Sequence, residues 1–200
     1  MTKVCTLLAL LALCLAGCAP LQVNLSGSEY QPTPGTAATP KRVASITIIN
    51  RAADAELQNH PFSDSLIPIK TAVSTQSTVE SDIKLLLAET VNVGGNADKS
   101  IFVTIRKADA YWTMGVADRI PFVGLATAAR DREFIMYIVL SVEVRKDGAV
   151  VANYPVDRQV TIVGKATTRS AIAESYQHLV AKYRTEVLGD IQRNFIDKSL

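Results

Sequence analysis

Cysteine, histidine and an excess of charge of one sign are all scarce in this 200-residue sequence. Its three cysteines, Cys5, Cys14 and Cys18, fall within the first eighteen residues. The rest of the chain therefore has no disulfide scaffold, thiol nucleophile or cysteine-ligated metal. The 21 Lys+Arg nearly balance the 19 Asp+Glu, and this net charge of +2 gives no support to a nucleic-acid partner. A hydrophobic share of 48% excludes a wholly disordered chain, and the length suits one ordinary domain.

The spacings that catalysis and metal binding use are also missing. The sequence contains no His-x-x-x-His, no Gly-x-Ser-x-Gly and no phosphate-binding glycine loop. Of the two histidines, His60 precedes a proline, and His178 lies beside the apolar stripe of a predicted helix, which indicates the surface. Asp131 and Glu133 would share one face of a strand, but interleaved arginines indicate a solvated charge cluster rather than an acid–base pair. We therefore expect no enzyme and no metal site.

The chain has one conspicuous apolar run, and it is short. Thr6–Ala16 is an almost wholly apolar stretch of eleven residues, preceded by the positive charge of Lys3. A membrane-spanning helix needs about 20 such residues. Eleven residues instead fit the apolar segment of a secretory signal, so we interpret residues 1–17 as a signal peptide.

The run ends in Leu15-Ala16-Gly17-Cys18, which resembles the lipobox of bacterial lipoproteins. The resemblance implies cleavage between Gly17 and Cys18, a diacylglycerol on the Cys18 sulfur and an N-acyl chain such as palmitate on the new amino terminus. These covalent lipids are the only non-protein groups that we expect, and several acyl chains give durable anchoring. Ala19 stands where an aspartate would resemble an inner-membrane retention signal, which favours the outer membrane with the body facing the periplasm. The alternative is an ordinary signal peptide with a chance cysteine.

Residues 18–42 are interpreted as the lipidated N-terminus followed by a tether. Prolines at positions 20, 32, 34 and 40, with interspersed Gly, Ser and Thr, argue against regular structure. Fully stretched, the tether would reach roughly 80 Å, and as a flexible coil about 27 Å. It would then hold the body off the membrane. The alternative for its start is that Leu21–Leu25 adds an edge strand.

Residues 43–200 predict a single periplasmic domain with four main strands. Residues 50–74 are irregular apart from a short strand near Leu66–Val73. The main strands are β-branched or alternate apolar and polar residues, and they cover Val43–Ile49, Ser100–Trp112, Arg132–Lys146 and Ala149–Val163.

Two helices complete the predicted domain. Ser77-Thr78-Val79-Glu80 matches a capping box that opens the first, and Gly94-Gly95 marks its end. The second runs from about Thr168 to Phe195, with Gly189 predicting a kink or a close contact. The order β-α-β-β-β-α predicts a two-layer α+β fold, a four-stranded mixed sheet with both helices on one face. Its first crossover should be right-handed and place the first two strands parallel.

The connection between the second and third main strands, residues 113–129, is long and unexpectedly apolar. Loops of this length are uncommon and often functional. Ile120, Phe122, Val123 and Leu125 carry its apolar character. Either the loop folds back over the core, or it protrudes as an arm that contacts a partner or lipid.

The lipobox, Pro-rich tether, element order and closing amphipathic helix together resemble outer-membrane lipoproteins of the YajG type. More loosely, the body is similar to auxiliary lipoproteins of envelope ABC transporters and to the lipopolysaccharide-assembly lipoprotein. The resemblance implies an accessory or assembly role without catalysis, and it assigns no residue beyond Cys18. We expect a lipid-anchored envelope protein that binds a protein partner; the alternative is a periplasmic carrier of lipid or glycan.

Overall fold

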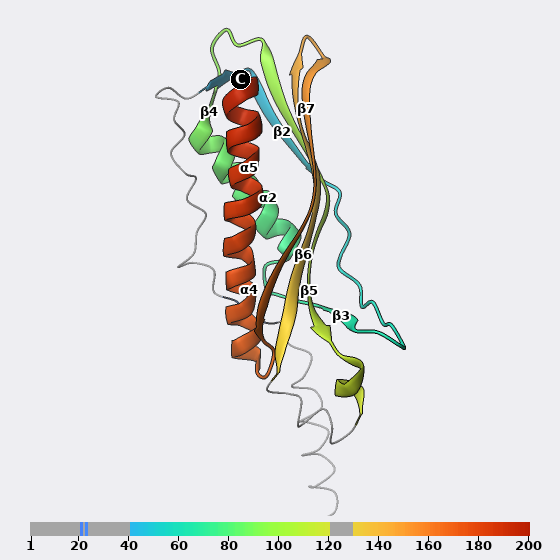
Figure 1. The fold of residues 1–200 in the computed structure, drawn as a ribbon. Coiled ribbons are helices and arrows are strands. Elements are labelled where there is room, and N and C mark those ends of the chain that lie inside the picture. Colours follow the sequence, from blue (N-terminus) through green and yellow to red (C-terminus); the bar gives the residue numbers. More distant parts are fainter. Residues whose placement is uncertain (1–20, 22, 24–40, 121–129) are drawn as a thin grey trace, which may run out of the picture.

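Three long strands form the centre of the fold as an antiparallel meander (Figure 1). They are β5 (Lys99–Met114), β6 (Asp131–Lys146) and β7 (Ala149–Lys165). The turn between β6 and β7 is Asp147-Gly148, and both residues have the positive φ that a tight two-residue hairpin requires. The computed structural model describes residues 21, 23, 41–120 and 130–200. The predicted meander is confirmed.

Two shorter strands share the edge of β5 that β6 leaves free. β2 (Ser45–Asn50) is parallel to the first part of β5, and β3 (Ser65–Pro68) is antiparallel to its last residues. The sheet order is β2-β5-β6-β7, with β3 beside β5. The parallel pairing of the first two main strands is therefore confirmed.

The predicted four-stranded sheet was wrong, because the described residues form a five-stranded sheet and a second sheet of two strands. In that second sheet, β1 (Lys41–Val43) pairs in parallel with β4 (Val91–Val93). The predicted strand Val43–Ile49 is in fact divided at Ala44 between the two sheets. Strands of three or four residues are too short to show an alternating pattern, which is why β1 and β4 escaped prediction.

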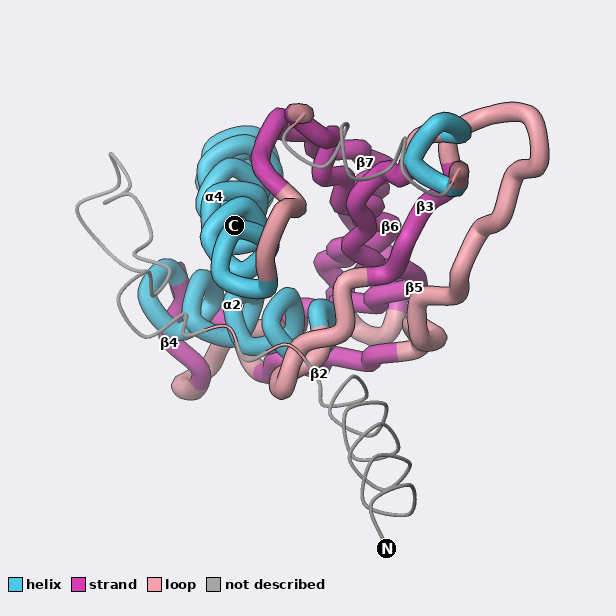
Figure 2. The backbone as a smooth tube through the Cα atoms, turned by 90° about the horizontal axis from the view of Figure 1, so that it is seen from below, coloured by secondary structure: helices cyan, strands magenta, loops and turns pink. Residues whose placement is uncertain are grey.

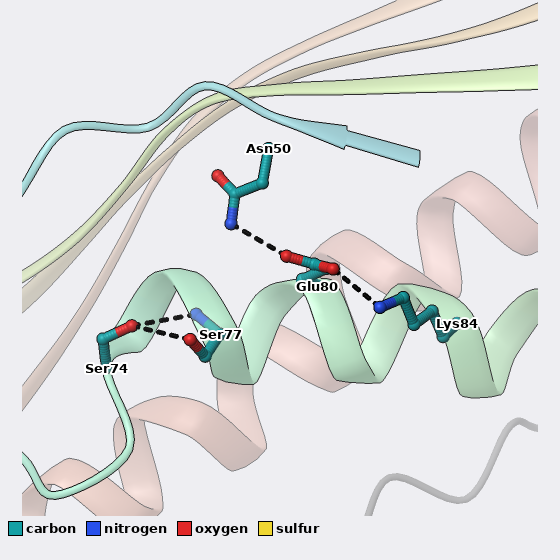
Figure 3. A network of polar contacts seen from close by, with 5 residues as sticks. All are labelled: Asn50, Ser74, Ser77, Glu80 and Lys84. Carbon is teal, nitrogen blue, oxygen red and sulfur yellow. Dashed lines mark hydrogen bonds and ion pairs between the residues drawn. The ribbon is translucent and has the colours of Figure 1, made fainter. Parts of the chain in front are cut away.

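The first helix, α2 (Thr75–Thr90), begins three residues before the predicted position. Its N-cap is Ser74, whose hydroxyl accepts a hydrogen bond from the Ser77 amide at 3.1 Å. Glu80 instead accepts hydrogen bonds from Asn50 at 3.1 Å and Lys84 at 2.6 Å (Figure 3). The predicted capping box was wrong, because a neighbouring serine offers the same chemistry and Glu80 joins α2 to β2.

The C-terminal helical segment begins at Thr168, whose hydroxyl caps the Ala171 amide at 3.1 Å. It starts as α4 (Arg169–Tyr183) and passes through two π-helical turns. It ends at Ser199, beyond the predicted end at Phe195. Gly189 lies between these turns, where an added Cβ would approach the Arg193 guanidinium to 3.0 Å. This is the predicted close contact. The later parts are η3 (Arg184–Leu188), α5 (Gly189–Ile191), η4 (Gln192–Ile196) and α6 (Asp197–Ser199).

Both helical segments cover the same face of the sheet (Figure 2). The predicted apolar row of β6 packs against them and is buried throughout, from Phe134 to Val144. No helix in the described residues is long and apolar enough to cross a membrane. The general class, α+β with a mixed sheet and two helical segments, is as predicted.

Candidate functional site

Ile120 is the one predicted site residue that lies within the described residues. Its side chain is 53% exposed, directly after the short helix η2 (Val116–Arg119). Gly17, Cys18, Phe122, Val123 and Leu125 lie outside the described residues. Whether residues 121–129 fold back or protrude therefore stays open, but the start of this connection is well defined.

The start of the 113–129 connection is fastened to β6. The Gly115 amide donates to the Asp118 carboxylate at 2.8 Å. The same carboxylate forms an ion pair with Arg132 at 2.7 Å, and both side chains are largely buried. Charge-assisted hydrogen bonds with little solvent around them hold geometry well. η2 is therefore a fixed element.

Arg119 fastens the turn at residues 60–63 to η2. Its guanidinium donates to the carbonyls of His60 and Ser63, at 2.7 and 2.9 Å, and to the Ser65 hydroxyl at 2.5 Å. The turn presents Phe62 with 95% of its side chain exposed, beside η2 with Val116 at 40% and Ile120 at 53%. We call these three side chains, Phe62, Val116 and Ile120, the apolar tip. Nothing in the local sequence pattern singled out Phe62.

Leu21 is attached to the folded body. Its amide donates to the Lys70 carbonyl at 2.9 Å, and its carbonyl accepts from the Ala72 amide at 3.1 Å. Leu21 and Val23 also pack against the core. The alternative to the tether, an edge strand at Leu21–Leu25, is represented in the described residues by this single bridge. Apart from Leu21, Val23 and residues 41–42, the predicted tether lies outside the described residues.

An apolar groove of about 360 Å³ lies between β2 and α2. β2 pairs with β5 along one side, and no strand in the described part of the chain pairs with its other side. Val93 at the groove is 59% exposed. A free strand edge beside an apolar groove is the geometry that accepts an extended peptide. The lining residues are Ile46, Ile48, Lys84, Leu87, Ala88, Val91 and Val93.

A second cleft, of about 320 Å³, opens at the start of α2 and is more polar. Ser74, Thr75 and Gln76 line it from the helix, and Asp54 and Lys70 line it from the loops. The Thr75 and Tyr176 hydroxyls hydrogen-bond at 3.1 Å, and the side-chain amide nitrogen of Gln76 donates to the Ala53 carbonyl at 2.9 Å. Burial raises the pKa of Tyr176, which keeps this phenol neutral. Thr75 and Gln76 at this cleft therefore already have hydrogen-bond partners within the protein.

Two carboxylates are buried in the part of the domain that the structure describes. Asp82 on α2 receives two hydrogen bonds from Arg184, at 2.8 and 2.9 Å, which join α2 to the C-terminal segment. Asp109 on β5 lies on the opposite face of the sheet, with Lys107 at 3.8 Å and the Tyr111 hydroxyl at 3.4 Å. Burial raises the pKa of both carboxyls. Neither is among the residues that line the groove or the polar cleft.

The residues considered earlier for catalysis are dispersed. His60 and His178 are exposed, and the His60 carbonyl serves Arg119. Asp131 is exposed and forms an ion pair with Lys165 at 2.6 Å. Among the described residues, no three histidines or carboxylates gather as metal ligands.

Comparison with protein families gives no match, and neither does comparison with curated protein sequences. The solved structures that match include three with TM-scores below 0.5. A Xanthomonas campestris protein of the family DUF330 has a TM-score of 0.47 at 13% identity, covering 86% of this chain and 94% of its own. A candidate lipoprotein from Caulobacter crescentus CB15 has a TM-score of 0.36 at 15% identity, covering 78% and 93%.

The third structure is a candidate homolog of the neuraminyllactose-binding hemagglutinin, from Helicobacter pylori. Its TM-score is 0.33 at 7% identity, covering 82% of this chain and 95% of its own. At these TM-scores the comparisons carry no argument about the fold or the function of this chain.

Proposed function

We propose that this chain is a non-catalytic lipoprotein of the bacterial outer membrane, anchored through lipids on Cys18, with its body facing the periplasm. The observation that carries the anchor is the Leu15-Ala16-Gly17-Cys18 sequence after an eleven-residue apolar run. Its role is that of an accessory or assembly subunit that binds a protein partner, as in lipoproteins of the YajG type. The exposed histidines and the ion-paired Asp131 fit a non-catalytic body.

The partner surface is the groove between β2 and α2. An extended segment of the partner adds to the free edge of β2 and places alternate apolar side chains in the groove. Main-chain hydrogen bonds would supply affinity, and Ile46, Ile48 and Val93 would select apolar side chains.

Site-directed photo-crosslinking in native envelopes tests this partner surface. A crosslinker at Val93 should capture one defined envelope protein, identified by mass spectrometry, and Ile46→Asp should abolish the product. A crosslinker at Val163, which is 66% exposed on the opposite edge strand, is the matched control and should not capture that protein. Equal capture from both positions, or capture that survives Ile46→Asp, contradicts the proposed surface.

The apolar lining also supports a second candidate, a carrier that holds a lipid acyl chain. The groove volume falls within the usual range for small-molecule sites, about 300–1,000 Å³. Native mass spectrometry of the intact protein should then show a bound lipid that Ile46→Asp releases. A protein that never retains lipid excludes the carrier.

A further inference from the structure

We propose that the apolar tip contacts the surface of the same bilayer that anchors Cys18, so that the body lies against the membrane in one orientation. This inference rests on the proposed lipid anchor. It names a second contact with the lipid, made by Phe62, Val116 and Ile120 from two segments distant in sequence. The three residues are 95%, 40% and 53% exposed, and they belong to two segments that Arg119 holds together. An exposed apolar cluster of this kind marks a surface for another molecule or for a membrane.

The tip is presented by fixed structure. Arg119 holds the Phe62 turn at two carbonyls and one hydroxyl, and Asp118 holds η2 to Arg132. A preorganised apolar projection loses little conformational entropy when it binds a surface.

The position of Leu21 brings the anchor to the same region. Cys18 is three residues before Leu21 and so is at most about 10 Å from it along the chain. Leu21 pairs with Thr71, just beyond β3, whose other end at Ser65 adjoins Met114 and η2. From Lys70 to Ser65 along β3 is about 17 Å.

The direction of the chain strengthens this placement. The bridge between Leu21 and Thr71 is parallel, so the chain at Leu21 runs in the direction that leads from β3 toward α2. The chain therefore enters Leu21 from the side of β3, which is also the side of the tip.

The charged residues of η2 indicate that the tip would bind lipid through apolar contact and not through attraction to anionic headgroups. The charged side chains of η2, Asp118 and Arg119, are engaged within the protein. The contact should therefore depend on apolar area and change little with salt concentration.

Fluorescence quenching by brominated lipid tests the contact in the full lipidated protein. Trp112 is the single tryptophan, so Trp112→Phe gives a silent background. In it, Phe62→Trp places an indole at the tip, and Val151→Trp places one at the β6–β7 hairpin, where Val151 is 54% exposed. These positions lie near opposite ends of β5, about 50 Å apart. Vesicles contain phosphatidylethanolamine and phosphatidylglycerol with bromine on the acyl chains.

The expected result is quenching of about twofold for Phe62→Trp and none for Val151→Trp, since interfacial side chains insert about 5–10 Å. Equal emission from both variants with and without bromine overturns the inference, and so does stronger quenching at the hairpin. If Trp112→Phe unfolds the chain, Trp112 is kept and its own quenching is subtracted.

Flotation of the same vesicles separates this inference from the anchor. Protein that floats with the vesicles without quenching at Phe62→Trp retains the anchor and contradicts the tip contact. Protein that does not float contradicts both. Loss of quenching in Phe62→Trp after adding Arg119→Ala, with flotation unchanged, supports the positioning by Arg119.

Discussion

The two faces of the sheet each bury a carboxylate, and they treat it differently. On the face covered by helices, Asp82 receives two short hydrogen bonds from Arg184. On the other face, Asp109 is 6% exposed, with Lys107 at 3.8 Å and the Tyr111 hydroxyl at 3.4 Å. One of its oxygens has no hydrogen-bond partner among the described residues. A buried charge with a matched partner fixes geometry, whereas one without it costs stability. Asp82 is therefore a structural joint between α2 and the C-terminal segment, whereas Asp109 lowers the stability of the fold.

The largest effect is expected on the helix-covered face. Arg184→Ala leaves Asp82 buried without its cation and should lower the free energy of unfolding by about 3–5 kcal/mol. Urea unfolding followed by circular dichroism measures it.

Its control is the double variant Asp82→Leu with Arg184→Met, which replaces the pair by apolar groups. This variant should recover most of the loss. A single Arg184→Ala that unfolds like the unaltered chain would falsify the description of the pair as a joint.

A smaller effect is expected where α4 approaches β7. A Cβ at Gly164 would lie 2.4 Å from the Ser175 Oγ and 2.8 Å from its Cβ, so Gly164→Ala forces the helix away. We expect a loss of about 1–3 kcal/mol in thermal or urea unfolding. The control is the double variant Gly164→Ala with Ser175→Gly, which removes the side chain that the added Cβ would meet and should restore part of the packing. No loss in Gly164→Ala would mean that α4 and β7 lie further apart.

The corrected helix cap gives an effect of about 1 kcal/mol. Ser74→Ala removes the acceptor for the Ser77 amide and should lower the free energy of unfolding by about that amount. Ser77→Ala keeps that amide and its acceptor, so it should cost less. The reverse order in urea unfolding would restore the predicted capping box.

The smallest effect is expected at Asp109, on the sheet face that the helices do not cover. Here the substitution should raise the free energy of unfolding instead of lowering it. Burial raises the pKa of Asp109, so the folded chain holds this proton at pH values where the unfolded chain, near 3.8, has lost it. The free energy of unfolding therefore falls as pH rises from 3.8 through the raised value. Asp109→Asn should stabilise the protein by on the order of 1 kcal/mol near pH 7 and by nothing near pH 3. Asp82→Asn, which strands Arg184, should instead destabilise it.

Long periodic segments were predictable, and contacts between distant segments were not. The β6 row from Phe134 to Val144 and the stripe from Tyr176 to Phe195 carry the period of their structure over many residues. β1 and β4 have three residues each and depend on pairing across the chain. The Ser77–Glu80 motif is present in the sequence, but Ser74 and Asn50 decide how its groups are used.

The candidate sites divide in the same way. The lipobox is a local motif, and the apolar character of Ile120 is visible in the sequence. Phe62 joins Ile120 only because Arg119 reaches across more than fifty positions in sequence to the turn. The groove between β2 and α2 likewise needs the sheet order, which leaves one side of β2 free.

Intact-mass spectrometry of the mature protein from a bacterial envelope tests the lipid anchor most directly. The account predicts a chain that begins at Cys18 and carries the added mass of a diacylglycerol and one N-linked acyl chain. A Cys18→Ser variant should lack the lipid and leave the membrane fraction. A mature chain with an unmodified Cys18, or one that begins at another residue, would contradict the anchor and the bilayer contact inferred from it.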